Sequence, residues 1–197
     1  MFSRIFSIPA VFAAVLMLCS CAEPVVFSEV FQQRADQKLY TAYNIWYTDP
    51  AEISCLNIQQ GAYIPVGTEI EPVSTNWYSD KIVFKSVPDG KLFTIKFDSG
   101  YRLCTMREFI GYTFTTSPQT ELLKDLPAAV KKHILRGEVL PGMNEKALLL
   151  TYGPPPACRT KDLRNSSWIY WRTPENTVRV ILRDDKVRSL INVGQEI

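Results

Sequence analysis

The chain has 197 residues, of which 46% are hydrophobic, a content that supports a packed core and excludes a largely disordered protein. The formal net charge is only +2, so there is no overall electrostatic case for a nucleic-acid partner. A chain of this length accommodates one domain or two small ones.

The first 20 residues have the pattern of a secretory signal peptide. Arg4 supplies a positive charge, and a largely apolar run follows from Ile5 to Leu18. This run of about 14 residues is shorter than the roughly 20 that a helix needs to cross a bilayer. We therefore expect residues 1–20 to be a signal peptide that is removed from the mature protein.

The end of this segment, Leu18-Cys19-Ser20-Cys21, resembles the lipobox of bacterial lipoproteins. The resemblance implies that Cys21 is lipidated and becomes the first residue of the mature chain. Several acyl chains would anchor it, since each buried methylene contributes about 0.8 kcal/mol. Ala22 follows instead of aspartate, which by resemblance to bacterial sorting rules favours the outer membrane, with the protein facing the periplasm. Lipidation at Cys19 and an ordinary secreted protein are the alternatives.

Residues 21–37 are expected to form a lipidated tether, and residues 38–116 a small all-β domain. Short strand candidates recur in the latter at about ten-residue spacing, without a helical stretch. They are Lys38–Tyr47, Ile53–Ile58, Tyr63–Val73, Lys81–Val87, Lys91–Phe97, Tyr101–Cys104 and Phe109–Thr115. The sequence Pro88-Asp89-Gly90 is a tight-turn signal. This pattern predicts an antiparallel barrel or sandwich.

Three further cysteines, Cys55, Cys104 and Cys158, lie in the mature part of the chain. In an oxidising compartment an odd number favours one disulfide and one free thiol. We expect the disulfide to join Cys55 and Cys104, because both lie in the same predicted domain; three free thiols are the alternative. The wide spacing of the cysteines and the single histidine, His133, indicate no metal site, and the sequence predicts no cofactor.

The composition changes at Ser117-Pro118, where a helix is expected to begin. Pro127 is a point at which this helix can restart. A second helix, Glu145–Tyr152, is capped by Asn144 and ended by Gly153. Three strand candidates follow, at Ser167–Arg172, Thr177–Arg183 and Val187–Val193. Residues 117–197 therefore predict an α+β unit, with two helices on one face of an antiparallel three-stranded sheet.

The aromatic residues of the first of these strands indicate which way it faces. Trp168 and Tyr170 lie two residues apart and therefore share one face of the strand, which we expect to pack against the helices. Trp171 is expected to point to the opposite face.

Five short motifs occur in order behind the lipobox. They are Ile134-x-x-Gly137, Pro141-Gly142-Met143-Asn144-Glu145, Tyr152-Gly153-x-Pro155, Trp168-x-Tyr170 and Asp184-Asp185-Lys186-Val187. Together they resemble the SmpA/OmlA family, the BamE-like outer-membrane assembly lipoproteins. The resemblance implies a two-layer ααβββ domain over residues 117–197 and a role in envelope or outer-membrane protein assembly. Family members typically have only this domain behind their tether, so the additional residues 38–116 make that role a loose implication.

The motifs of common enzyme classes are missing from the sequence. It has no Gly-x-Ser-x-Gly elbow, no phosphate-binding loop and no paired-histidine metal motif. We therefore expect a protein that is not an enzyme and that binds or stabilises other envelope proteins. Trp46, Trp77 and Trp171 are candidate interface residues, since tryptophan is enriched at interface hot spots. The alternative is a lipoprotein that binds a small molecule or lipid in a pocket of its N-terminal β domain.

Residues 158–194 carry eight basic and four acidic side chains. Arg179, Arg183 and Arg188 are the expected partner contacts in this stretch. Arg179 and Arg183 share a strand face, and Arg188 follows the hairpin turn. A solvated strand face is the simpler alternative for this local charge.

Overall fold

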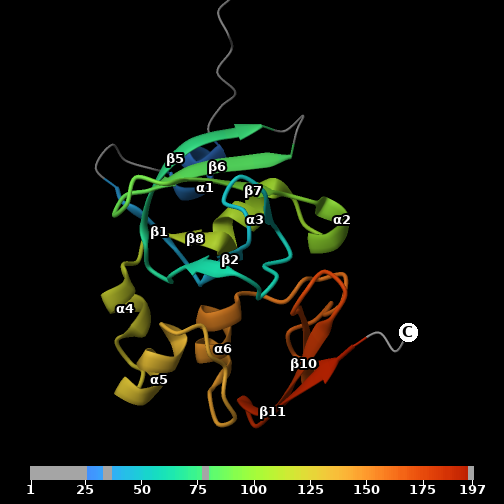
Figure 1. Ribbon diagram of the computed structural model, residues 1–197. Helices are drawn as coiled ribbons and strands as arrows, with labels where there is room; N and C mark the ends of the chain where they lie inside the picture. Colours follow the sequence, from blue (N-terminus) through green and yellow to red (C-terminus); the bar gives the residue numbers. More distant parts are fainter. Residues whose placement is uncertain (1–25, 33–36, 77–79, 195–197) are drawn as a thin grey trace, which may run out of the picture.

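Two hydrophobic cores organise the part of the chain that the computed structural model describes, which is residues 26–32, 37–76 and 80–194 (Figure 1). The first core belongs to the N-terminal half and the second to the C-terminal half, with Val66 from the N-terminal half joining the second core. The fold is α+β, as the sequence predicts.

The N-terminal half is built on a curled, six-stranded sheet in the order β3-β7-β6-β5-β1-β8. Its strands are β1 (Leu39–Thr41), β3 (Ile53–Ser54), β5 (Glu69–Asn76), β6 (Lys81–Ser86), β7 (Leu92–Lys96) and β8 (Phe114–Thr115). All neighbours pair antiparallel except β3 and β7, which are parallel. Strands β2 (Ile45–Tyr47) and β4 (Ala62–Ile64) form a separate two-stranded sheet. The predicted turn at Pro88-Asp89-Gly90 joins β6 to β7.

The prediction that residues 38–116 are all β is wrong at their C-terminal end. Helices α2 (Ser99–Arg102) and α3 (Met106–Thr113) stand where strands were expected, and only β8 remains of the last one. A capping box starts α3, because Thr105 accepts a hydrogen bond from the Glu108 amide while the Glu108 carboxylate accepts one from the Thr105 amide. The helix then buries a stripe on one face, so that cap and periodicity together outweigh the strand preference of its aromatic residues.

The predicted tether also contains folded structure. Helix α1 (Val26–Phe31) buries Phe27 completely, and its ring centroid lies 5.1 Å from that of Phe114. The Arg107 guanidinium donates to the Glu29 carboxylate at 2.9 Å and so ties α1 to α3. The expectation of a simple tether over residues 21–37 is therefore corrected at residues 26–31. Residues 1–20 and Cys21 lie outside the described residues.

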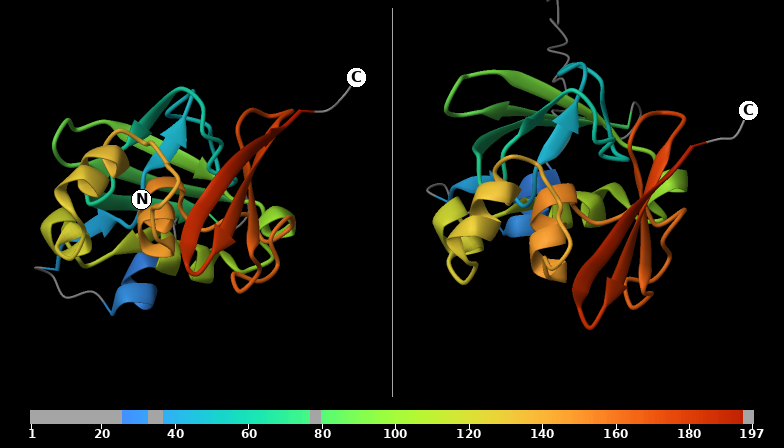
Figure 2. Two further views of the ribbon diagram at one scale, coloured as in Figure 1. Left: turned by 90° about the horizontal axis from the view of Figure 1, so that it is seen from below. Right: turned by 60° about the horizontal axis from the view of Figure 1, so that its bottom comes forward.

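The C-terminal half places helices before strands, as expected. Helices α4 (Gln119–Leu123), α5 (Ala128–Ile134) and α6 (Glu145–Tyr152) precede the antiparallel strands β9 (Ser167–Trp171), β10 (Thr177–Arg183) and β11 (Lys186–Val193). The first predicted helix is split into α4 and α5, and Pro127 is the N-cap residue of α5. Trp168 and Tyr170 are fully buried in the second core, and α6 lies on this face of the sheet (Figure 2).

Buried polar side chains join the two halves. The Asn44 amide donates to the Ile134 carbonyl, and the Asn57 amide donates to the Tyr152 carbonyl, both at 2.8 Å. The buried Arg102 guanidinium donates to the Pro154 carbonyl at 2.9 Å. Gly153 has a φ of +73°, and a Cβ there would lie 2.6 Å from the Tyr43 ring, so only glycine allows this close approach.

Candidate functional site

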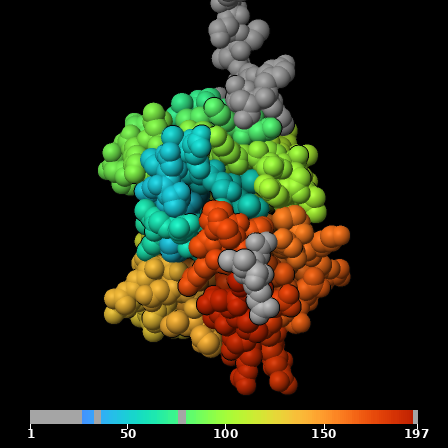
Figure 3. All heavy atoms as spheres, turned by 45° about the vertical axis from the view of Figure 1, so that its right-hand side comes forward, coloured from blue at the N-terminus to red at the C-terminus, as the bar shows by residue number. Residues whose placement is uncertain are grey.

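The C-terminal sheet has one buried face and one open face. On β10, Val178, Val180 and Leu182 point into the second core, while the alternate residues point outward. Cross-strand pairing places Ile169 and Ile191 on either side of Arg179, so the outer face combines apolar side chains with a guanidinium. Figure 3 shows β10 and β11, in red, on the open surface below the N-terminal half.

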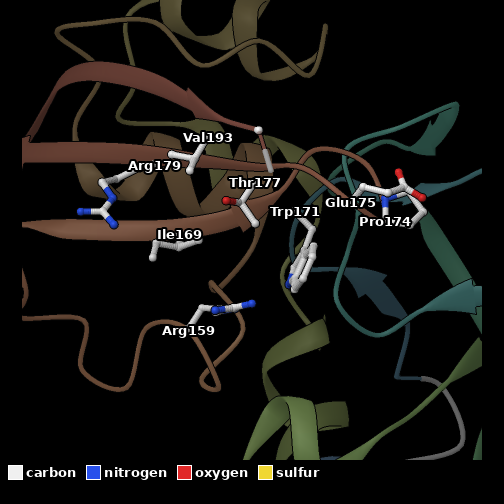
Figure 4. A pocket seen from close by; sticks show the side chains of 9 residues that line it. Arg159, Ile169, Trp171, Pro174, Glu175, Thr177, Arg179 and Val193 are labelled. Carbon is white, nitrogen blue, oxygen red and sulfur yellow. The ribbon is translucent and has the colours of Figure 1, made fainter. Parts of the chain in front are cut away.

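A hollow of about 380 Å³ lies at one end of this outer face (Figure 4). It is lined by Arg159, Ile169, Trp171, Pro174, Glu175, Thr177, Arg179, Val193 and Gly194. We call this hollow the arginine groove. Its lining includes two guanidinium groups, one carboxylate and an indole. Such a set can bind a carboxylate beside an apolar or aromatic group.

Arg159 and Trp171 form the central pair of the arginine groove. The Arg159 guanidinium carbon lies 5.5 Å from the centroid of the Trp171 ring, which is within the range of a cation–π interaction. The main chain holds this tryptophan in place, because the Trp171 carbonyl accepts a hydrogen bond from the Gln59 amide at 2.9 Å. The Trp171 indole nitrogen is buried and has no hydrogen-bond partner among the described residues.

The arginine groove continues toward the junction between the two halves. A neighbouring hollow of about 590 Å³ shares Arg159, Trp171 and Pro174 with it. The further lining residues are Leu56, Ile58, Gly100, Tyr101 and Cys158. Residues of both halves therefore line this second hollow, which adjoins the arginine groove at the three shared residues.

The structure separates the three arginines that the sequence analysis selected. Arg179 lines the arginine groove, whereas Arg183 and Arg188 line a different hollow of about 280 Å³ beside Pro141 and Gly142. The Arg183 guanidinium also lies 3.8 Å from the Asp184 carboxylate, an exposed ion pair. The second guanidinium group of the arginine groove belongs to Arg159. Arg159 was not among the arginines selected from the sequence, because it lies over the Trp171 ring only when the loop before β9 is folded.

The predicted Cys55–Cys104 disulfide is not formed, and all three described cysteines are free thiols. The Cys55 thiol lies 4.0 Å from the Asp98 carbonyl oxygen, and the Cys104 sulfur lies 3.2 Å from the Tyr112 hydroxyl oxygen. Each sulfur therefore has its own polar neighbour. Burial raises the pKa of the Cys55 thiol, which keeps it protonated and unreactive.

The tryptophans proposed as interface residues differ in their surroundings. Trp171 lines the arginine groove. Trp46 packs within the protein, 4.6 Å between ring centroids from Tyr63, and a Cβ on Gly137 would lie 2.5 Å from its ring. Trp46 is half-buried, as Trp171 is, so its role at an interface stays a prediction, and Trp77 lies outside the described residues.

A further hollow, of about 530 Å³, lies on the N-terminal half. Four aromatic rings line it, from Tyr40, Tyr47, Tyr63 and Phe93, and its charged lining residues are Glu69 and Asp89. We call it the tyrosine pocket. The Lys91 ammonium stands 5.0 Å from the Tyr47 ring centroid beside it. Hydrogen bonds from Ser86 and the Lys91 amide lower the pKa of Asp89, so this carboxylate is charged at neutral pH.

Other chemistry-bearing groups of the described residues do not gather into a site. No group of three histidine, cysteine, aspartate or glutamate side chains among them is arranged to hold a metal ion. The His133 Nδ1 lies 2.6 Å from the Glu138 carboxylate, and this pair belongs to no such group among the described residues. Within the described part of the chain, no helix has the length and apolar character needed to span a bilayer.

Comparison of the chain with protein-family models, with curated proteins and with solved structures finds no match. The similarity to the SmpA/OmlA family therefore stays a prediction from the five motifs quoted above.

Proposed function

We propose that this chain is a lipoprotein of the bacterial outer membrane, anchored through Cys21 and facing the periplasm, that acts by binding other envelope proteins and not by catalysis. The observation that carries the proposal is the arginine groove. Its indole and its two guanidinium groups lie on an open sheet face whose opposite side is buried. Tryptophan and arginine are the residues most enriched among interface hot spots.

The groove indicates the chemistry of its partner. Guanidinium groups recognise carboxylates through paired hydrogen bonds, and the apolar lining offers contact area around them. An acidic surface with an exposed apolar side chain complements such a groove. The partner in this proposal is therefore an acidic envelope protein, and nucleic acid is not a candidate.

The lipobox and the order of helices and strands support the rest of the proposal. A lipid on Cys21 would confine the protein to the membrane surface, where partners are concentrated. Helices followed by a three-stranded antiparallel sheet is also the arrangement that the SmpA/OmlA resemblance implies for residues 117–197. We therefore propose that these residues form a BamE-like domain used for envelope assembly.

Charge reversal in the groove tests the proposal. We expect the Arg159→Glu/Arg179→Glu variant to lose association with envelope complexes in co-purification from solubilised membranes, and to lose more at low salt because exposed charges are screened at high salt. The matched control is Arg183→Glu/Arg188→Glu, which changes the charge equally outside the groove and should retain association. If only Arg183→Glu/Arg188→Glu lost association, the contact surface would lie at the β10–β11 hairpin and not in the groove. Full binding by both variants would overturn the proposal.

The tyrosine pocket favours a second candidate function, the binding of a small molecule or lipid. Its aromatic lining and volume suit a ligand with a flat or apolar part. Native mass spectrometry of protein released gently from membranes would detect such a ligand. A ligand that is lost from Tyr40→Ala but retained by Arg179→Glu would support this function, and a protein that is always empty would contradict it.

A further inference from the structure

The two outer strands of the C-terminal sheet differ in what covers their free backbone edges. On β9, the Ile169 amide donates to the Thr160 hydroxyl and the Trp171 carbonyl accepts from the Gln59 amide, both at 2.9 Å. On β11, only the start is covered, because the Val187 amide donates to the Met143 carbonyl and the Val187 carbonyl accepts from the Gly142 amide. Beyond Val187, no backbone partner on this edge is found among the described residues.

The pairing register shows which β11 groups face outward. In an antiparallel ladder, a residue directs both its amide and its carbonyl to the same side, and successive residues alternate. Ile169 points away from β10, so its opposite residue Arg179 points toward β11 and bonds with Ile191. Leu190 and Asn192 then direct their amides and carbonyls outward, away from the sheet.

From Ser189 to Gly194, and among the described residues, this edge lacks the features that usually keep strand edges from pairing. Natural edge strands carry charged residues, prolines or covering segments that block a further strand. Residues 189–194, Ser-Leu-Ile-Asn-Val-Gly, contain no charge and no proline. Ile191 and Val193 are 49% and 43% exposed on the outer face. Figure 2 shows β11 along the outside of the sheet, with β10 on its other side.

We propose that the outer edge of β11 accepts an extended, acidic segment of a partner protein as a fourth strand. The inference rests on the proposed function and specifies how the partner binds. Main-chain hydrogen bonds to Leu190 and Asn192 hold the segment. Its side chains on the outer face of the sheet lie in line with those of Ile191 and Val193, next to the arginine groove.

Charge complementarity selects an acidic segment. Arg179 and Arg159 lie across the sheet face beside this part of the edge. A second copy of this chain would bring its own two arginines toward the same face, so self-pairing is disfavoured. A segment in which glutamate or aspartate alternates with β-branched residues matches both the strand geometry and the charge.

The first experiment uses amide hydrogen exchange on the folded chain. The probe is a capped octapeptide of alternating valine and glutamate, and its control contains lysine in place of glutamate. We expect the acidic peptide to slow exchange at Leu190 and Asn192 at least tenfold, with little change at Ile191 and Val193, whose amides are already bonded to β10. No selective slowing with the acidic peptide, or equal slowing with both peptides, would overturn the proposal.

The second experiment removes the outward donor. Asn192→Pro deletes an amide that the sheet does not use, and proline is tolerated at such edge positions. Asn192→Ala is the matched control that keeps the amide. We expect Asn192→Pro to bind the acidic peptide at least fivefold more weakly and Asn192→Ala to bind within twofold of the original chain, as measured by calorimetry.

The outcomes separate this inference from the proposed function. Equal peptide affinity of Asn192→Pro and Asn192→Ala overturns strand addition. If envelope association is then lost only in Arg159→Glu/Arg179→Glu, the groove is the contact and the proposed function stands. Exchange protection at Leu190 that grows with protein concentration without peptide would show pairing between two copies and would also overturn the inference.

Discussion

The arginine groove and the tyrosine pocket show that the two halves of this chain offer different surfaces. The groove lies on an open sheet face with Arg159 and Arg179 as its cations, whereas carboxylates are the charged groups of the pocket, which has aromatic walls. Each hollow depends on its own hydrophobic core, and the buried amides of Asn44 and Asn57 join the cores. One chain can therefore present two chemically distinct surfaces.

The largest expected effect comes from removing the indole of Trp168, which lies on the buried face of the sheet that carries the arginine groove. Trp168 is fully buried and donates to the Leu163 carbonyl at 3.1 Å. We expect Trp168→Ala to lower the free energy of unfolding by about 3–5 kcal/mol, the range for large aromatic deletions in cores. Urea unfolding measures this, with Trp171→Ala on the opposite face as a control that should cost markedly less. Equal costs would show that the groove does not depend on the C-terminal core.

The next effect tests the junction that couples the two surfaces. The Asn57 side chain bonds the Asn44 carbonyl, the Tyr152 carbonyl and the Trp46 amide. Asn57→Gly leaves these buried groups unpaired and should cost about 1–3 kcal/mol in urea unfolding. Asn57→Ala should cost about 1 kcal/mol more, because the φ of Asn57 is +54° and a Cβ is strained there.

A single unfolding transition in both Asn57 variants would show that the halves stay coupled. Two separated transitions, one followed by a probe in the arginine groove and the other by a probe in the tyrosine pocket, would show that the groove and the pocket unfold independently.

The reactivity of the cysteine thiols compares a buried position with partly exposed ones, and its measurement needs no change in stability. Burial of Cys55 and its raised pKa predict slow alkylation, whereas Cys104 and Cys158 are partly exposed. A raised pKa also means that Cys55 becomes reactive only at higher pH than an ordinary thiol. We expect Cys55, Cys104 and Cys158 all to be alkylated after unfolding without reductant, with Cys55 the last of the three to be modified in the folded chain. A mass consistent with one remaining disulfide would contradict the free thiols.

The smallest effect concerns the loop before β9. Side-chain hydrogen bonds from Arg164 hold the pKa of Asp162 at about 2. A carboxyl whose pKa is lowered on folding binds fewer protons when folded, so its stabilisation is present above the ordinary value of 3.8 and is lost as the pH falls toward 2. The pair is exposed, so stability should change little.

Carboxyl NMR titration checks this assignment. Arg164→Ala should return the Asp162 midpoint toward 3.8, while Arg183→Ala should leave it unchanged. An unchanged midpoint in Arg164→Ala would show that another group holds the carboxylate.

Local sequence patterns were sufficient for much of the fold. The Pro88-Asp89-Gly90 turn, the Asn144-capped helix and the three C-terminal strands were predicted because caps, turns and alternation act between residues close in sequence. The same kind of signal was present for α3, since Thr105 and Glu108 form a capping box. It was missed because the aromatic residues after it also suit a strand.

Tertiary structure alone decided the candidate site. Arg159 reaches Trp171 only because its loop folds over β9, and Asn57 bonds a carbonyl 95 residues away. The separation of Arg179 from Arg183 and the exposed edge of β11 depend on which strand neighbours which. Side-chain polarity and spacing act locally, so the sequence alone was enough for the periodic elements and the inward face of Trp168, and the lipobox stays a prediction from it. Contacts between distant segments follow from packing two cores together, which no local pattern specifies.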